Sequence, residues 1–213
     1  LPAGSTVKVT LGMGYVERAI VSGDLKIVQR TYLAKSDEAV IDEVAITNLG
    51  KASQQLNYLP YWDVNWQMST AVGLVADGSK VIGAYDSSRR TVKLVSQATR
   101  GNMNVPSKIV DPSPKVAYLT ALSHPLESFE TDQAAFFGSG MRSNPAEAMR
   151  RASLPNRLPT VFNQSRNDAT VLVGRFNVTL APAQTTTIYT AYGITEVGTE
   201  NAAIDRLRSG YAV

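Results

Sequence analysis

The alternation of apolar and polar residues along this chain predicts β-strands. Short segments rich in β-branched and aromatic residues recur through most of its length, separated by Gly, Asp, Asn, Ser and Pro. In the stretch 175–180, Arg175, Asn177 and Thr179 alternate with apolar residues, which is the period of a strand with one buried face. The stretch 40–48 shows the same two-residue period.

The number of such segments predicts two packed sheets. We expect strands at 6–11, 25–33, 40–48, 54–61, 68–75, 80–84, 91–97, 116–122, 175–180 and 186–192. A turn at 48–51 joins two of them, and the Pro-rich segment 105–114 forms a long surface connection. So many strands exceed what one open sheet holds comfortably. The predicted fold is therefore all-β, a large antiparallel two-sheet β-sandwich with one or two short peripheral helices.

Two short helices are predicted from residues that suit helix ends. Asn144 fits an N-cap, Pro145 the first turn, and Glu147 the third position, where its carboxylate reaches back to free backbone amides. Thr199 caps a second helix that ends near Gly210. The modest apolar stripe of this second helix consists of Ala203, Ile204 and Leu207. We expect both helices to lie against the sandwich rather than define the fold.

Length and composition fit one folded domain. The chain has 213 residues, of which 44% are hydrophobic and 18% charged, a balance that allows a sizeable core and argues against extensive disorder. Because large β-sandwiches often use this length as one unit, we expect residues 1–213 to form a single β-sandwich domain. Residues 1–6 lack an initiator Met and already have the composition of a turn leading into a strand. We therefore expect a fragment of a larger multidomain protein.

Charge and hydropathy exclude several classes of partner. Twenty-one Lys and Arg against 18 Asp and Glu give a net charge of +3, and the basic residues are too scattered for a nucleic-acid interface. No apolar run approaches the roughly 18 residues of a membrane span, and the first residues lack the layout of a signal peptide. The absence of cysteine excludes disulfides but leaves the compartment open, with the cytoplasm slightly favoured.

The usual catalytic constellations are missing from the sequence. His124 is the only histidine, no G-x-S-x-G motif frames a serine, and one His without Cys makes a zinc site improbable. We interpret His124 as a surface or turn residue. Paired carboxylates of a glycosidase remain an alternative, but we interpret the candidates as turn caps and solvated charges; these candidates are Asp63, Glu127, Glu130 and Asp132. We expect no catalytic residue, cofactor or metal ligand in this chain.

An aromatic and polar cluster is the best binding candidate. It contains both tryptophans of the chain and consists of Tyr58, Tyr61, Trp62, Asp63, Asn65, Trp66 and Gln67. Aromatic faces stack on sugar rings while neighbouring amides and carboxylates bind hydroxyls, so the composition suits a carbohydrate. The alternative is a core strand in which alternation buries Trp62 and exposes Tyr61. Arg142, just before the predicted helix at 144, is a further candidate for a sugar or an anion.

Several stretches resemble, in the same order, the N-terminal domain of the cellobiose phosphorylase family, which includes cyclic β-glucan synthases and chitobiose phosphorylases. These stretches are Gly14-Tyr15 with Asp24-Leu25, residues 42–48, 56–65, 129–138, 144–149, 180–193 and 200–208. The most specific is 129–138 (FETDQAAFFG) followed by Asn144-Pro145-Ala146, which is similar to a family segment with Arg in place of Gln133. Any ion pair made by that Arg is in doubt here.

This resemblance implies a galactose mutarotase-like supersandwich whose catalytic and phosphate-binding residues lie in a following (α/α)₆ barrel. The chain would then be a non-catalytic part of a glycoside phosphorylase or glycosyltransferase acting on glucans. It would pack on the barrel, help shape its substrate cleft and contribute to dimer contacts. Such a scaffold predicts an exposed apolar face.

Two other functions stay open at this point. An independent carbohydrate-binding module predicts an open aromatic platform that binds an oligosaccharide. A self-sufficient mutarotase-like enzyme predicts a cleft with converging titratable groups, and the shortage of histidine counts against it.

Overall fold

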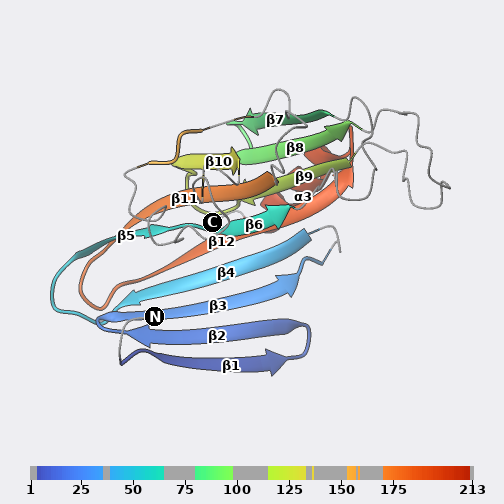
Figure 1. Cartoon of the computed structure of the whole chain (residues 1–213). Helices are drawn as coiled ribbons and strands as arrows, with labels where there is room; N and C mark the ends of the chain where they lie inside the picture. Colours follow the sequence, from blue (N-terminus) through green and yellow to red (C-terminus); the bar gives the residue numbers. More distant parts are fainter. Residues whose placement is uncertain are drawn as a thin grey trace, which may run out of the picture.

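Two antiparallel sheets make up most of the fold, as the sequence predicts (Figure 1). The structure, a computed structural model, describes residues 4–35, 39–64, 80–97, 115–132, 136, 153–156, 158 and 170–211. The large sheet runs in the order β1 (Thr6–Gly12), β2 (Tyr15–Ser22), β3 (Leu25–Leu33), β4 (Ala39–Asn48), β12 (Thr185–Glu196), β9 (Lys115–Ala121), β8 (Thr91–Gln97) and β7 (Lys80–Asp86). The small sheet runs β10 (Ser128–Asp132), β11 (Thr170–Leu180) and β5 (Gln54–Tyr58), and β6 (Tyr61–Val64) also pairs with β11.

The first three strands form a meander with two-residue turns. Gly12 pairs with Tyr15 across the first turn and Ser22 with Leu25 across the second. Gly14 and Gly23 supply the positive φ angles, 81° and 56°, that such turns require. The strand 15–22 is not among the strands expected from the sequence. This strand carries charges in its middle, and its pairing with β1 and β3 outweighs the weak local pattern.

The main core lies between the two sheets. The face of the large sheet that points toward the small sheet is called the inner face, and the opposite face is called the outer face. The inner face contributes Val44, Leu94 and Leu119, and the small sheet contributes Leu172 and Phe176, all at most 1% exposed. Each fully buried side chain of this kind contributes about 1.5–3 kcal/mol to stability, so this core accounts for the pairing of the two sheets.

The helix α3 (Glu200–Gly210) packs on the outer face of the large sheet, behind β9 and β12 in Figure 1. Its buried residues are Ala203, Ile204 and Leu207, the predicted stripe. The predicted cap needs a correction, because the Thr199 side chain makes no capping hydrogen bond. Its hydroxyl instead donates to the carbonyl of Glu196 at 2.9 Å, and the Glu200 carboxylate accepts the N–H of Gly198 at 2.7 Å.

The return strand predicted at 54–61 is wrong in one respect, since it is two strands, β5 and β6. Pro60 lacks the N–H that a continuous strand would donate, so the ladder breaks there. The N–H of Gly174 donates to the Pro60 carbonyl at 3.1 Å. The chain between β5 and β6 therefore stays hydrogen-bonded to β11. The expected elements at 68–75, 105–114 and 144–149 lie outside the described residues.

No helix among the described residues is long and apolar enough to cross a membrane. The longest described helix has 11 residues, α3.

Candidate functional site

The strand β6 carries the described part of the predicted aromatic cluster. Trp62 is half-buried, packs against the core between the sheets, and sets its ring edge against Tyr192 at 5.7 Å between centroids and 77° between planes. Tyr61 lies on the other side of the strand, 37% exposed, and stacks on Phe136 at 5.8 Å. The opposite orientations of Trp62 and Tyr61 agree with the predicted alternation, in which Trp62 contributes to the core.

The rest of that cluster is not brought together by the described part of the chain. Asp63 pairs with Val171 through its backbone. Asn65, Trp66, Gln67 and Arg142 lie outside the described residues. The carbohydrate-binding role of this cluster therefore stays a prediction.

His124 lies in the segment after β9, near the place where the sequence put it. Its Nδ1 lies 2.8 Å from the hydroxyl of Ser123 and its Nε2 lies 3.2 Å from the hydroxyl of Thr186. Partial burial, and to a lesser extent the charge of Arg90, lower the pKa of the imidazole. Both ring nitrogens are engaged in hydrogen bonds to hydroxyl groups, an arrangement that positions the ring structurally.

The interpretation of Glu130 as a solvated charge is wrong. This residue lies in β10 opposite Val173 and is 0% exposed, with Oε1 accepting the backbone N–H of Thr131 at 2.9 Å. Arg175, expected on a solvent-facing side, is only 4% exposed, and its Nε donates to Asn177 at 3.2 Å. Glu130 and Arg175 lie on the outer side of the small sheet, where a buried apolar cluster also lies. The residues that cover this cluster also shield Glu130 and Arg175 from solvent.

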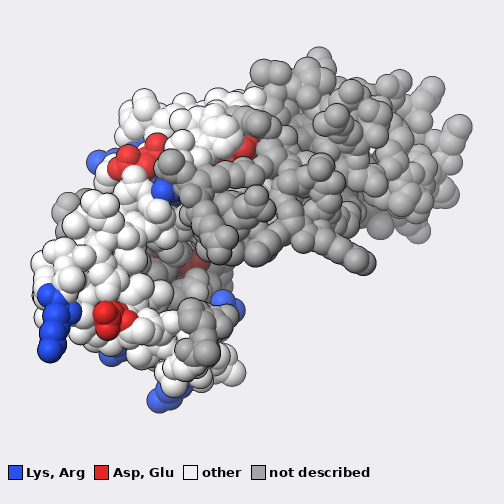
Figure 2. Space-filling view, turned by 60° about the vertical axis from the view of Figure 1, so that its left-hand side comes forward, with Lys and Arg blue, Asp and Glu red and all other residues white. Residues whose placement is uncertain are grey.

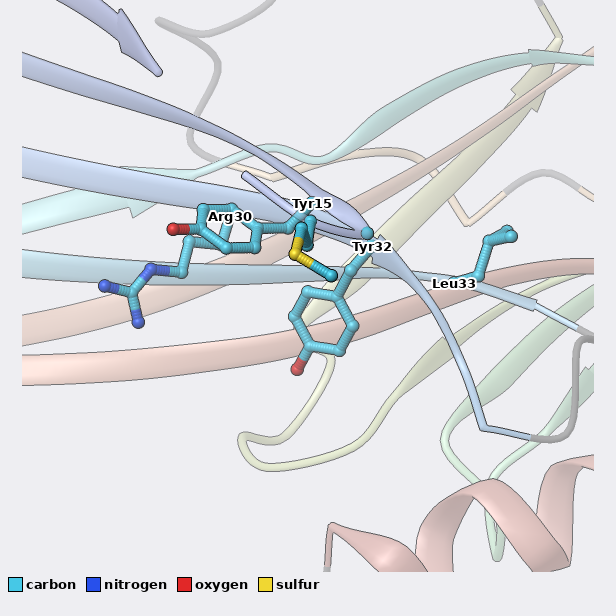
Figure 3. Close-up of a pocket in the computed structure, with 6 residues that line it drawn as sticks. Tyr15, Arg30, Tyr32 and Leu33 are labelled. Carbon is cyan, nitrogen blue, oxygen red and sulfur yellow. The ribbon is translucent and has the colours of Figure 1, made fainter. Parts of the chain in front are cut away.

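A pocket of about 430 Å³, wide open to solvent, lies where β2 begins and β3 ends, beside the first turn. Its lining is Met13, Gly14, Tyr15, Arg30, Tyr32 and Leu33. Tyr15 pairs directly with Tyr32 across the two strands. In Figure 3 Tyr15 lies beside the side chain of Arg30, whereas Tyr32 and Leu33 point in opposite directions, as neighbours in a strand do.

A row of charged residues crosses the outer face next to this pocket. Glu17 pairs with Arg30, Arg30 with Glu43, and Glu43 with Tyr189, so four adjacent strands contribute one residue each. Nε of Arg30 donates to Glu17 at 2.7 Å, and its Nη1 lies 3.8 Å from a carboxylate oxygen of Glu43. The guanidinium carbon lies 6.0 Å from the centre of the Tyr15 ring.

Three further tyrosines lie beside this row, and together with it they form what is called here the tyrosine platform: Tyr15, Tyr32 and Tyr211, with Glu17, Arg30, Glu43 and Tyr189 of the row. The rings of Tyr189 and Tyr211 lie 5.6 Å apart, and Tyr211 follows α3. Burial, and then a hydrogen bond with Tyr211, raise the pKa of the Tyr32 hydroxyl. Burial also raises the pKa of Tyr189, and both hydroxyls, like any phenol at neutral pH, are protonated and can donate hydrogen bonds.

Sequence reasoning missed the tyrosine platform because its members come from β2, β3, β4, β12 and the residue after α3. The turn residues Gly14 and Gly23 are the feature of the sequence that could have indicated this platform. Two-residue turns at these glycines fix the register that places Tyr15 opposite Tyr32.

The inner face of the large sheet extends beyond the small sheet and exposes apolar side chains there. In Figure 1, β1, β2 and β3 lie below the small sheet. Val7, Val9 and Leu11 alternate along β1 on this face and are 51%, 58% and 79% exposed; they are called here the apolar strip. On β2, half-buried Val16 and Ile20 pair with Leu11 and Val7, and the exposed Arg18 between them pairs with Val9. An alternating apolar edge of this kind is typical of an interaction surface.

Basic side chains are dispersed over one face of the described surface. Figure 2 shows Lys and Arg side chains in separate places among uncharged residues on the face in view. Within the described residues, no group of three or more His, Asp or Glu side chains is placed to hold a metal ion.

Comparison with known proteins identifies a family. The glycosyl hydrolase 94 supersandwich domain matches residues 1–211. A comparison with curated proteins gives no match. Among solved structures, a putative kojibiose phosphorylase from human microbiome matches with a TM-score of 0.52 and 7% identity over 93% of this chain. That match covers 21% of the phosphorylase, so the chain spans about a fifth of that protein's length.

Two further solved structures have weaker matches. Heparan sulfate lyase HepC from Pedobacter heparinus gives a TM-score of 0.37 at 9% identity, covering 90% of this chain and 22% of the lyase. The Slr1438 protein from Synechocystis sp. PCC 6803 gives 0.41 at 9% identity, covering 89% of this chain and 65% of that protein. The match over nearly all of the sequence, together with the two-sheet architecture, shows that this chain belongs to the glycosyl hydrolase 94 supersandwich family.

Proposed function

We propose that this chain is the non-catalytic β-sandwich domain of a glycoside phosphorylase or a glucan-processing glycosyltransferase. In that role it packs on an (α/α)₆ catalytic barrel of the same protein and helps shape the barrel's substrate cleft. The observation that carries this proposal is the apolar strip on β1, which leaves three aliphatic side chains at least half exposed.

The apolar strip is a surface that association would stabilise. Burying an aliphatic side chain contributes about 1.5–3 kcal/mol, and Val7, Val9 and Leu11 stand in one row on one strand. Their strand is the edge of the large sheet in the described part of the fold, where Lys8 alternates with them on the outer face. A partner that covers the inner side of β1 would bury this row and leave Lys8 in solvent.

The partner that we favour for the apolar strip is a catalytic barrel. Supersandwich domains of this family normally pack against one. The chain spans about a fifth of the matched phosphorylase, so a protein of that size has room for a barrel besides this domain. The family resemblance also implies contacts between two copies of the chain. These contacts, and the surface that they would use, stay a prediction.

The experiment compares Leu11→Asp in the isolated chain and in the longer protein that carries it. We expect the urea midpoint of the isolated chain to change little, because Leu11 is 79% exposed. In the longer protein we expect Leu11→Asp to lower the melting temperature of the catalytic part and its activity. Leu49→Asp, at a 52% exposed residue between β4 and β5, is the matched control. Equal effects of the two variants in the longer protein would contradict the proposal.

A carbohydrate-binding module is the second candidate function, and the exposed Tyr61 ring on β6 favours it. The test is a tryptophan-fluorescence titration of the chain with β-linked glucan oligosaccharides. A saturable signal that Tyr61→Ala or Trp66→Ala abolishes in a chain that stays folded would support this function, whereas a folded chain without any response would argue for the scaffold alone.

A further inference from the structure

The tyrosine platform is a second surface with carbohydrate-binding chemistry, on the opposite side of the large sheet from the apolar strip. Tyr15 is 38% exposed, the side chain of Arg30 is 48% exposed, and the open pocket of about 430 Å³ lies between them and Tyr32 (Figure 3). That volume falls within the range of ligand sites, and its openness suits part of a chain rather than an enclosed monosaccharide. Neither the apolar strip nor the cluster on β6 shares a residue with it.

The side chains of the platform are held in place before any ligand arrives. A Cβ atom on Gly12 would lie 2.2 Å from two ring atoms of Tyr15, so the ring rests against the bare backbone of its cross-strand neighbour. Arg30 is held from both sides, by Glu17 and by Glu43. The Tyr32 hydroxyl lies 3.5 Å from Glu43. Groups that are already ordered lose little side-chain entropy on binding, which favours affinity.

The chemistry of the platform matches a sugar chain. Tyrosine rings offer apolar faces to the C–H faces of pyranose rings, and the guanidinium, the carboxylates and the phenol hydroxyls offer donors and acceptors to sugar hydroxyls. The tyrosine that follows α3, Tyr211, extends this surface toward the helix.

Charge decides between neutral and anionic sugars. The row contains the two carboxylates of Glu17 and Glu43 and the one guanidinium of Arg30, which is already paired with both. On the same face, Lys8 and Lys26 belong to rows nearer the other end of the strands. A uronate or a phosphate at the pocket would face an excess of negative charge, whereas a neutral oligosaccharide would not.

We propose that the outer face of β2 and β3 binds a neutral oligosaccharide, with Tyr15 stacking on a sugar ring and with Arg30 and Glu17 hydrogen-bonding its hydroxyls. This binding requires neither a barrel nor the aromatic cluster on β6. In a longer protein it would give the domain its own contact with a polysaccharide chain, separate from a catalytic cleft.

The test is isothermal titration of the 213-residue chain at neutral pH with cellohexaose, laminarihexaose and maltohexaose, and with hexagalacturonate as the anionic probe. We expect saturable binding of at least one neutral hexasaccharide with a Kd of about 1 mM or tighter, and weaker or undetectable binding of hexagalacturonate. Absence of binding by all three neutral probes would overturn the proposal. Stronger binding of the uronate would overturn the assigned ligand class.

Variants locate the site. Tyr15→Ala should weaken binding about tenfold, the scale of one lost aromatic contact, whereas Tyr15→Phe keeps the ring and should stay within about twofold. Tyr85→Ala is the matched control, because Tyr85 has nearly the same exposure, 36% against 38%, and lies on β7 at the opposite edge of the large sheet. If Tyr85→Ala weakens binding as much as Tyr15→Ala does, the site is elsewhere and the proposal fails.

A second variant covers the case in which Tyr15→Ala disturbs the hairpin. Arg30→Gln keeps a polar side chain of similar length and removes the charge and most of its donors. With an unchanged far-ultraviolet circular dichroism spectrum, it should also weaken binding about tenfold. A folded Arg30→Gln chain that binds like the wild type would overturn the role of Arg30 and, with it, the proposed site.

Discussion

Arg89 and Asp205 form a two-point ion pair that ties the turn between β7 and β8 to α3. Nε of Arg89 donates to Oδ1 of Asp205 at 2.8 Å and Nη2 donates to Oδ2 at 2.9 Å. Nη1 of the same guanidinium donates to Asp86 at 2.9 Å. The Arg89 carbonyl in turn accepts Nη1 of Arg208 at 2.9 Å. One turn residue thus holds the helix onto the outer face through both its side chain and its backbone.

Replacing this arginine should reduce stability in a pH-dependent way. A hydrogen bond from Ser88, and then those from Arg89, lower the pKa of Asp86, and the hydrogen bond from Arg89 lowers the pKa of Asp205. Carboxyls with lowered folded-state pKa values stabilise the fold above their unfolded value, here 3.8, and lose that contribution as the pH falls through the folded values. Arg89→Met should therefore melt at a lower temperature than the wild type at neutral pH.

The measurement is thermal unfolding by circular dichroism from about pH 7 down to about pH 2. The difference between wild type and Arg89→Met should shrink below the unfolded carboxyl pKa, because the unfolded chain then binds protons at Asp86 and Asp205 that the folded wild type does not. Arg18→Met, at an exposed arginine on β2, removes the same charge as a control. A difference that stays constant down to about pH 2 would show that the carboxylates do not carry the effect.

Asn48 should be among the most sensitive polar residues of the fold. It is 0% exposed, its Nδ2 donates to the carbonyls of Ala52, Leu180 and Ala181 at 2.8–3.2 Å, and its Oδ1 accepts the N–H of Gly50 at 2.9 Å. Asn48→Ala should lower the free energy of unfolding by about 2–4 kcal/mol, since buried carbonyls lose their donor.

Urea unfolding measures this effect, with Asn57→Ala as the control at an exposed asparagine on β5. Exposed substitutions usually change stability by about 0.5 kcal/mol or less. A similar loss in the two variants would mean that the hydrogen bonds of Asn48 contribute nothing beyond those of a surface amide.

The strands were predictable where local pattern and final environment agree. The segments 25–33 and 91–97 combine β-branched residues with turn residues at their ends, and both are strands with those bounds. The burial of Glu130 was not predictable, because it depends on what covers the outer side of β10. The tyrosine platform was equally hidden, since Tyr15 and Tyr189 reach one surface only through the order of strands in the sheet.

His124 should make the fold less stable as the pH falls below neutrality. Burial, and then the charge of Arg90, lower its pKa, so between that value and the unfolded 6.5 the unfolded chain binds a proton that the folded chain does not. Stability therefore declines as the pH drops through this window. Because the chain has a single histidine, one imidazole resonance in a proton NMR titration reports the folded pKa directly.

The control is His124→Gln, which removes the titrating group. In urea unfolding the wild type should lose more stability than this variant between about pH 7 and pH 5. An imidazole that titrates at or above 6.5 in the folded chain would contradict the prediction.

Trp62 and Tyr61 should separate structural from binding effects on β6. Trp62 packs into the core against Tyr192, whereas Tyr61 lies on the opposite side, 37% exposed and stacked on Phe136. Trp62→Ala should lower the free energy of unfolding by about 2–4 kcal/mol, because it leaves a cavity between the sheets. Tyr61→Ala should lower it by about 1 kcal/mol, the scale of one aromatic contact.

Urea unfolding of both variants, followed by circular dichroism, gives the two free energies. If Trp62→Ala proves nearly neutral, its ring contributes little to the core and becomes available for a ligand, which would favour the binding-module function. If Trp62→Ala destabilises as expected, loss of sugar binding in that variant cannot by itself assign a contact to Trp62. Tyr61→Ala is then the substitution that tests binding on β6, because its smaller structural effect leaves the fold intact.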